Sequence, residues 1–247
     1  MKAWLARRDN RHVRCRGAAG RFSLSCGGIE ISDSLRQQLN HWILPGFMTL
    51  DEVHGAVDDN ELEDGYPNDD PHATAEQVWI ERKAQESEWE HPTDYDRVQA
   101  AFDEMEEQGL VTGMSLGFDV SDCNELLGEE RTPIDAPDGE YRYREWASCG
   151  FHMQDAEGLA YEPTELNLVF GAWTPGPPIA GEVDAEKLRK GHPERKDEWA
   201  RMDAALGRFL VDILKRHDLE VEWDGDPRGR IQLLNLRWRK PLPEDEA

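Results

Sequence analysis

Apolar side chains recur at helical spacing in three stretches of the chain, and each stretch is bordered on one side by a residue that breaks a helix. The first precedes Pro45 and Gly46, the second precedes Gly109, and the third follows His192 and Pro193. Their apolar positions are Leu35, Leu39, Trp42 and Ile43; Val98, Ala101, Phe102 and Met105; and Trp199, Met202, Leu206, Phe209, Leu210, Ile213 and Leu214. The pattern therefore predicts three amphipathic helices.

Three threonines begin segments with the spacing of a capping box, in which a threonine and a residue three positions later exchange hydrogen bonds. They are Thr49 with Glu52, Thr74 with Gln77, and Thr93 with Asp96. Each predicts a helix start. The segment 58–70 between the first two is acidic and rich in turn-forming residues, so we expect a solvated loop there.

Alternation of apolar and polar residues predicts the strands. We expect a strand over 110–120 and an excursion from the sheet over 121–146. Short strands follow at "GFHMQD" and "LNLVFGA", and the last pair is centred on 219–223 and 231–238, with a bulge at Leu233–Leu234 where the apolar phase slips. Residues 13–26 predict a small N-terminal hairpin around a Gly-Ala-Ala-Gly turn.

This order of elements predicts an α+β fold, with helices packed on one face of a largely antiparallel sheet and an N-terminal hairpin and helical extension. We expect residues 1–41 to form a basic arm, the hairpin and the start of the first helix, and 42–92 a helical segment with the acidic loop. The α+β domain covers 93–240, and 241–247 form an acidic tail.

Charge changes the picture of possible partners. The 247 residues carry a formal net charge of −24, and the first 21 residues alone carry +6, which leaves −30 on the rest. Such an acidic body repels nucleic acid and anionic membranes, so we expect neither as a partner. A basic protein is the partner class that the charge favours.

No apolar run approaches the ~20 residues that span a bilayer, and the N-terminus lacks the apolar core of a secretory signal. We therefore expect a cytoplasmic protein. Cys15, Cys26, Cys123 and Cys149 show no CxxC spacing, which favours free thiols and predicts neither a metal site nor a cofactor.

Several pieces, in order, resemble one bacterial family of unknown function, DUF6891. They are "WILPGFMTLDEV", "TDYDRVQAAFDEMEEQGLV", "GFHMQD", "LNLVFGA" and "LEVEWDGDPRGRIQL" with "LRWRK", which together span about residues 42–240. The family pattern includes a cysteine cluster after the helix at 93–109, where this chain has only Cys123. The resemblance brings no activity with it.

The stretch "DGDPRG" contains the first candidate contact residues. Asp224 and Asp226 have the spacing that opens a calcium loop, but Arg228 occupies the third ligand position and Asn235 the twelfth. Asp-Gly and Pro instead supply the backbone angles of a hairpin turn. Asp224, Asp226, Arg228 and Arg230 are then possible partner contacts, the two guanidinium groups being suited to a carboxylate.

A second candidate lies on the strand predicted at "GFHMQD". There His152 and Gln154 share one face, and together with Asp155 and Asn167 they could line a ligand cleft, with Arg228 or Arg230 approaching. Two polar residues on one strand face also occur where the face is merely solvated. We assign no catalytic residue and no metal ligand.

Two functions follow from these patterns. The first is a noncatalytic acidic protein that acts through protein–protein interaction, as an inhibitor or immunity-type partner of a basic protein. The alternative is an enzyme or small-molecule binder that uses the sheet-face cleft around His152. The sequence favours the first, because a charge of −24 can steer a basic partner.

Overall fold

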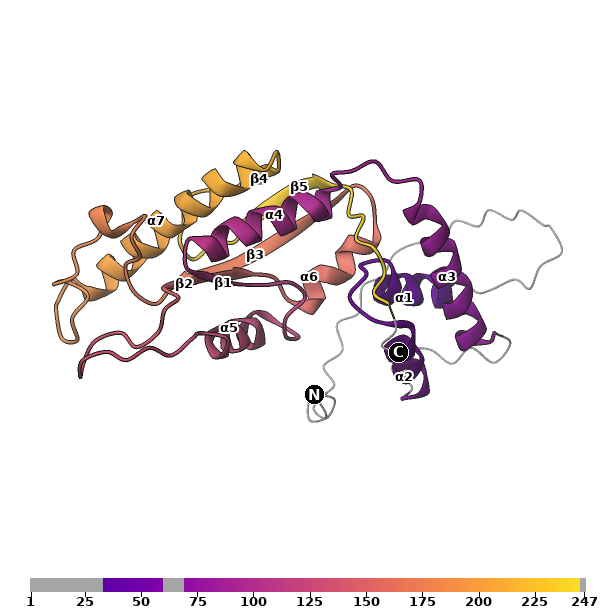
Figure 1. Cartoon of the computed structure of the whole chain (residues 1–247), viewed down its shortest axis with the longest axis horizontal. Helices are drawn as coiled ribbons and strands as arrows, with labels where there is room; N and C mark the ends of the chain where they lie inside the picture. The colour runs from indigo at the N-terminus through magenta and orange to yellow at the C-terminus, as the bar shows by residue number, and fades with distance from the viewer. Residues whose placement is uncertain (1–32, 60–68, 245–247) are drawn as a thin grey trace, which may run out of the picture. The chain divides into compact units, whose positions relative to one another are not determined.

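The computed structural model describes residues 33–59 and 69–244 (Figure 1). The predicted N-terminal hairpin and most of the acidic loop lie outside these residues. Residues 31–247 form one compact unit. In chain order the elements are α1 (Asp33–Ile43), α2 (Leu50–Asp58), α3 (Pro71–Glu86), α4 (Asp94–Glu107), β1 (Leu110–Gly113), α5 (Val120–Glu129), β2 (Ala147–Gly150), α6 (Met153–Glu157), η1 (Gly158–Ala160), β3 (Thr164–Ala172), η2 (Ala180–Glu182), α7 (Arg195–Arg216), β4 (Glu220–Glu222) and β5 (Ile231–Leu236).

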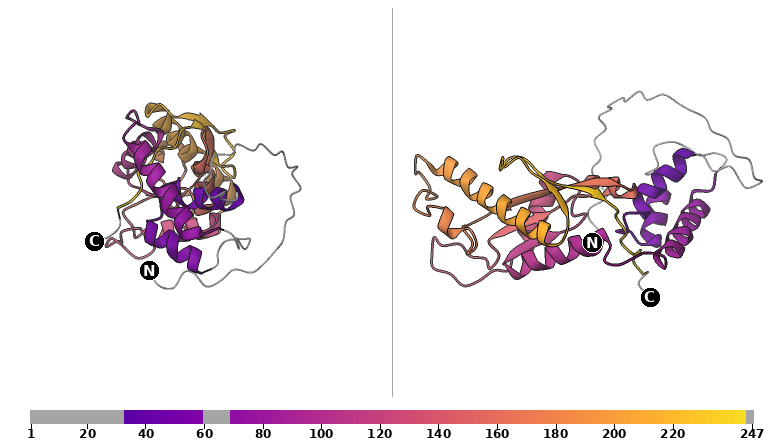
Figure 2. Two further views of the ribbon diagram at one scale, coloured as in Figure 1. Left: turned by 90° about the vertical axis from the view of Figure 1, so that its right-hand side faces the viewer. Right: turned by 90° about the horizontal axis from the view of Figure 1, so that it is seen from above.

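The strands form one sheet in the order β1-β2-β3-β5-β4. Among the strands of the described residues, only β1 and β2 pair in parallel, and the other three pairs are antiparallel. The long helices α4 and α7 share the main apolar core with the sheet, and Figure 2 shows α7, in orange, lying alongside the strands. The predicted α+β fold with a largely antiparallel sheet is confirmed.

Helix α5 lies on the other face of the sheet from α4 (Figure 1). Its buried Cys123 and Leu127 pack against Val111 of β1 and Val169 of β3, each of which neighbours a residue of the main core along its strand. Successive side chains of a strand point to opposite faces, so the sheet is covered on both faces over β1–β3. No helix was predicted here, and α5 is an exception to the prediction that the helices pack on one face of the sheet.

The caps of α2 and α4 confirm two of the three predicted helix starts. Thr49 and Glu52 exchange the hydrogen bonds of a capping box, and so do Thr93 and Asp96. The start predicted at Thr74 is wrong, because α3 begins one turn earlier at Pro71, with Asp70 accepting from the backbone N–H of Ala73. Proline at the first helical position and an aspartate before it are the stronger start signal.

The predicted strand over 110–120 is also wrong beyond its first four residues. β1 ends at Gly113, and the chain then turns, with Ser115 at φ 53° and Gly117 at φ 71°, into α5 at Val120. Gly117 fits this turn because a Cβ there would lie 2.8 Å from the backbone nitrogen of Cys123. Exposed apolar residues in the turn produced an alternation that imitates a strand.

The strand predicted at "GFHMQD" ends where that motif begins. β2 is Ala147–Gly150, and His152 caps the short helix α6. His152 and Gln154 therefore do not share a strand face, as the alternation had predicted. The predicted strand at "LNLVFGA" is confirmed as part of β3, and the predicted long helix as α7.

The predicted bulge lies in β5, one to two residues beyond the expected position. Thr164 pairs with Leu236 and Leu166 with Leu233, so β5 has one more residue than β3 in this interval. Asn235, at φ 54°, absorbs the extra residue. Leu233 and Leu236 are consequently both buried although three positions apart.

Candidate functional site

The carboxyl ends of the parallel strands β1 and β2 lie side by side and form the first part of the site. The backbone N–H of Phe151 donates to Gly113 O, that of Leu116 to Phe151 O, and that of Met153 to Gly117 O, each at 3.0 Å. A Cβ on Gly150 would lie 2.6 Å from Gly113 O, so glycine permits this approach. Ligands of open α/β sheets commonly bind at such strand ends.

His152 follows β2 directly and is held by Asp155 through both of its ring nitrogens. Nδ1 accepts from the Asp155 backbone N–H at 3.4 Å as the cap of α6, and Nε2 lies 2.9 Å from Asp155 Oδ2. This arrangement places the ring proton on Nε2. The side chain is buried, with 4% of its surface exposed.

Arg230, at the residue before β5, closes the cluster from the neighbouring strand. Its Nη1 donates to Asp155 Oδ1 at 3.2 Å, and its Nη2 donates to Asp155 Oδ2 and, at 2.6 Å, to Asn167 O. This is a two-point guanidinium–carboxylate pair with an added carbonyl. We call His152, Asp155 and Arg230 the buried cluster.

Burial lowers the pKa of His152, and Arg230 lowers it further, while the Asp155 and Asp119 carboxylates act in the opposite direction. We therefore treat the imidazole as neutral at neutral pH. Asp155 and Arg230 balance each other in charge. The buried cluster is thus a neutral, hydrogen-bonded unit that ties α6 to β3 and β5.

Two buried thiols belong to the same region of the sheet. Burial raises the pKa of Cys123 to about 11, with Arg230 acting to lower it and Asp155 to raise it. Burial raises the pKa of Cys149 further. Both thiols are protonated and buried at neutral pH, which is the environment of structural cysteines.

Comparison with models of protein families identifies the family of the chain. The model described as "Domain of unknown function (DUF6891)" matches residues 29–242. The chain belongs to the DUF6891 family. Comparisons with curated proteins and with solved structures gave no match.

The DUF6891 domain brings together three of the four residues predicted for a ligand cleft. His152 and Asp155 meet in the buried cluster, and Asn167 joins through its backbone carbonyl. Gln154 is exposed and lies outside the cluster. Of the two arginines predicted to approach these residues, Arg230 lies among them, and its guanidinium donates to Asp155 and to Asn167 O.

The predicted hairpin turn separates the other candidate residues. Arg228 donates to Asp226 at 3.0 Å and 2.7 Å, and Asp226 N donates to Asp224 Oδ1 at 2.8 Å. Arg228 lowers the pKa of Asp226 to about 2. These three residues form an exposed turn between β4 and β5, while Arg230 points inward.

The turn after β1 contains a motif that was not predicted as part of a site. Residues 113–117 read Gly-Met-Ser-Leu-Gly, which fits the G-x-S-x-G pattern of serine nucleophiles, and Ser115 has the positive φ of a strained turn. In the described part of the chain, no hydrogen bond joins Ser115 to His152, whose nitrogens both contact Asp155. The motif is therefore present without the serine–histidine contact that activates such a nucleophile.

The same turn exposes a group of apolar side chains. Phe118, Val120 and Met153 are 38%, 41% and 37% exposed. They are three of the six large apolar residues that the described ranges leave exposed, and the hydrogen bond from Met153 N to Gly117 O holds Met153 beside this segment. The signal that could have revealed them was their alternation, which we interpreted as a strand.

The structure describes the DUF6891 domain over residues 33–59 and 69–244. Within these ranges, no set of three or more His, Cys, Asp or Glu side chains is grouped as metal ligands would be. No helix in the same ranges combines the length and the apolar character that crossing a membrane requires.

Proposed function

We propose that this protein is a noncatalytic cytoplasmic protein that binds a basic protein partner, in the manner of an inhibitor or an immunity protein. The observation that carries the proposal is the exposure of Phe118, Val120 and Met153 at one place beside acidic residues. We call this the docking surface and define it as Phe118, Val120 and Met153 with Asp119, Asp122 and Glu125.

Apolar contact supplies the energy of such an association. Burial of the exposed parts of these three apolar side chains would contribute about 1 kcal/mol each. Exposed apolar side chains that are grouped and rimmed by polar residues are typical of interaction sites. The docking surface has this composition over the turn before α5, the first two turns of α5 and the first residue of α6.

The carboxylates of the docking surface favour one class of partner. Asp119 accepts from the backbone N–H groups of Ser121 and Asp122, so its carboxylate is fixed at the start of α5. Glu125 lies exposed one turn further along the helix. In a chain of net charge −24, these carboxylates favour a partner segment that places Lys or Arg around an apolar centre.

The test compares affinity capture from native cytosol by the wild type, by the double variant Phe118→Lys with Met153→Lys, and by the control Ile80→Lys. Ile80 is 67% exposed on α3, so its replacement adds positive charge outside the docking surface. A protein of the same net charge serves as a second control. Bound proteins are eluted with increasing salt and identified by mass spectrometry.

We expect a basic protein that the wild type and Ile80→Lys capture, that the double variant loses, and that salt releases. The purified partner should then bind the double variant at least tenfold more weakly than it binds the wild type. Retention by the double variant, or capture of the same proteins by the charge-matched control, would overturn the proposal.

The second candidate is an enzyme or small-molecule binder built around His152. The G-x-S-x-G turn, which places Ser115 at the end of β1 on the segment bonded to Phe151, favours it. A fluorophosphonate probe tests it, since this probe labels activated serines. Labelling of the wild type that Ser115→Ala abolishes would support a hydrolase, and absence of labelling would argue against it.

A further inference from the structure

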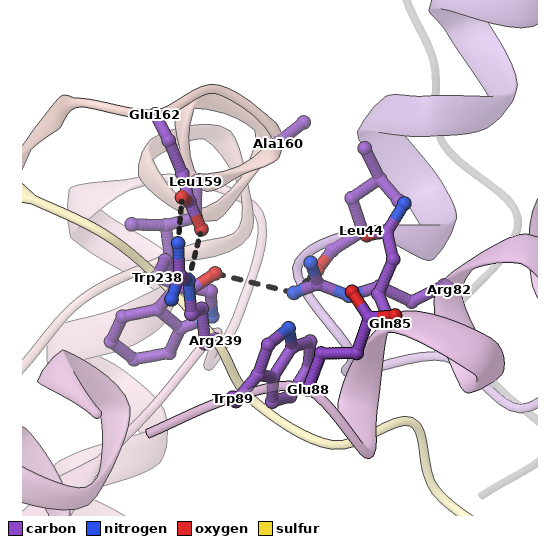
Figure 3. A pocket seen from close by; sticks show the side chains of 10 residues that line it. All are labelled: Leu44, Arg82, Gln85, Glu88, Trp89, Leu159, Ala160, Glu162, Trp238 and Arg239. Atoms are coloured by element: carbon purple, nitrogen blue, oxygen red, sulfur yellow. Dashed lines mark hydrogen bonds and ion pairs between the residues drawn. The ribbon is translucent and has the colours of Figure 1, made fainter. Parts of the chain in front are cut away.

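A pocket of about 400 Å³ lies between the end of α3 and the chain segments around η1 and the end of β5 (Figure 3). It is lined by Leu44, Arg82, Gln85, Glu88, Trp89, Leu159, Ala160, Glu162, Trp238 and Arg239. This volume falls within the ~300–1,000 Å³ of small-molecule sites. None of the residues of the buried cluster or of the docking surface lines it.

Arg82 is the unusual member of this lining. Its side chain is buried, with 6% of the residue exposed, and in the described part of the chain its hydrogen bonds go to backbone carbonyls, from Nη2 to Leu44 O at 3.0 Å and to Trp238 O at 3.2 Å. Nε is buried without an acceptor. A buried guanidinium that meets only neutral acceptors lacks the carboxylate that usually compensates its burial.

The walls of the pocket combine apolar and charged side chains around this cation. The Arg82 guanidinium lies over the Trp89 ring, 4.5 Å from its centroid, and Leu44, Leu159 and Trp238 add apolar surface. Burial lowers the pKa of Arg82, while the Glu162 and Glu86 carboxylates act to raise it. Arginine nevertheless remains charged in proteins.

The rim of the pocket limits how much negative charge a ligand can carry. Arg239 is already paired with Glu162, by hydrogen bonds of 3.3 Å and 3.2 Å, and Glu88 adds another carboxylate. A ligand with several negative charges would be repelled by these groups, whereas a single carboxylate can compensate Arg82.

From this combination we infer that the pocket binds a small monocarboxylate with an apolar body, whose carboxylate pairs with Arg82. The apolar body contacts Leu44 and the aromatic lining, and the carboxylate supplies the negatively charged acceptor that the guanidinium lacks. This site is separate from the docking surface, so it stands whether or not the proposed partner exists.

The experiment titrates the full chain with 3-phenylpropionate and with its neutral amide, 3-phenylpropionamide. The two probes have the same apolar body and differ in the charge that Arg82 would recognise. Binding is followed through the indole N–H resonance of Trp89, assigned with Trp89→Phe. We expect the carboxylate to shift this resonance and the amide to bind at least tenfold more weakly.

Ala160→Phe provides a blocking variant, because Ala160 lines the pocket and a phenyl ring there would occupy it. Ala180→Phe is the matched control, since Ala180 is exposed on η2 and does not line the pocket. We expect Ala160→Phe to abolish carboxylate binding and Ala180→Phe to retain it. Arg82→Lys should weaken it at least tenfold.

Three results would overturn the inference: equal binding of the carboxylate and the amide, unchanged binding by Ala160→Phe, or no resonance shift at the solubility limit of the probe. If Arg82→Lys does not fold, the comparison of the two probes and the comparison of Ala160→Phe with Ala180→Phe still test the inference.

Discussion

Arg230 is the residue on which the buried cluster depends most. Replacing it with methionine leaves Asp155 charged and nearly buried without its guanidinium partner, a change that costs about 3–5 kcal/mol in fully buried pairs. Because the Arg230 side chain is 30% exposed, we expect a smaller loss in the free energy of unfolding, about 2 kcal/mol, by urea denaturation.

Two further variants show whether this loss comes from the ion pair. Arg228→Met removes an arginine that is also paired with an aspartate but is 88% exposed, and we expect a loss below about 0.5 kcal/mol. Asp155→Asn combined with Arg230→Met should recover part of the stability, because asparagine needs no counter-charge. If the losses in the free energy of unfolding caused by Asp155→Asn and by Arg230→Met were strictly additive, this would contradict an ion pair between Asp155 and Arg230.

His152 should make stability depend on pH in a defined window. Its pKa is lowered in the folded state, so below the unfolded value of about 6.5 the unfolded chain takes up a proton that the folded chain does not. The free energy of unfolding should therefore fall as the pH drops from about 7 toward 5, by at most about 1.4 kcal/mol per pH unit.

His152→Gln removes this proton uptake, and we expect its stability to be flatter over the same window than that of the control His72→Gln. Carboxylates whose pKa is lowered, such as Glu104 and Glu145, lose their stabilisation at more acidic pH and so do not obscure the comparison. Equal slopes in the two variants would show that His152 is not the titrating group.

At the residue scale, the sequence predicted which side chains lie together better than it predicted the contacts between them. His152 and Asp155 were both assigned to a cleft on a strand face, but they meet at i and i+3 because His152 caps α6. A five-residue helix is too short to produce a recognisable helical periodicity in the sequence. The inward position of Arg230 depends on pairing between β3 and β5, which local pattern does not contain.

The bulge in β5 provides a test at the scale of single elements. Asn235 has φ 54°, a region that glycine occupies freely and alanine does not, and its side chain donates to Glu220 at 2.8 Å. Asn235→Gly and Asn235→Ala both lose that hydrogen bond, so the difference between them reports the backbone. We expect the glycine variant to be more stable by about 1 kcal/mol in thermal unfolding.

Gln232→Gly and Gln232→Ala are the matched pair without a positive φ, on the same strand. At position 232 we expect the alanine variant to be more stable than the glycine variant, because glycine weakens the interior of a strand. A glycine variant at 235 that is no more stable than the alanine variant would mean that the left-handed backbone at the bulge is not a source of strain.

Long helices were predictable from the spacing of their apolar residues, whereas short elements were not. Both long helices on the core face followed from apolar spacing, and the caps at Thr49 and Thr93 followed from side-chain chemistry. Helix α5 was missed because Phe118 and Val120, exposed in the turn before it and at its first residue, continue the alternation of β1. Their exposure depends on the whole fold, and it is what makes them candidates for the docking surface.

At the scale of the whole molecule, the described residues form two main apolar cores that are joined by the segment after β5. One lies between the sheet and helices α4 and α7, and the other is formed by α1, α2 and α3. Trp238 belongs to the first core and donates to Pro45 O, while Leu242 belongs to the second. The segment after β5 therefore reaches from the sheet into the helical core, and Arg82 holds the same segment at Trp238 O.

Leu242→Ala tests this connection. Leu242 is 3% exposed, its backbone N–H donates to Glu86 at 2.7 Å, and its carbonyl accepts from Lys83 at 2.9 Å. Removing a buried leucine costs about 2–5 kcal/mol, and we expect the lower end because a segment near the chain end can relax. Since the lost contacts are in the helical core, hydrogen exchange should accelerate in α1 and α3 and remain unchanged in β3.

Pro241→Ala is the control, since Pro241 is exposed and adjacent in the chain, and its exchange pattern should match the wild type. Equal acceleration in β3 and in α1 would show that the two cores open together, and the terminal segment would then be a cooperative part of the sheet. Acceleration confined to the helices would mean that α1–α3 can loosen on their own. Because Leu44 and Arg82 come from that helical side of the pocket, binding of the inferred monocarboxylate should then weaken in Leu242→Ala. Binding of the proposed partner at the docking surface should not change.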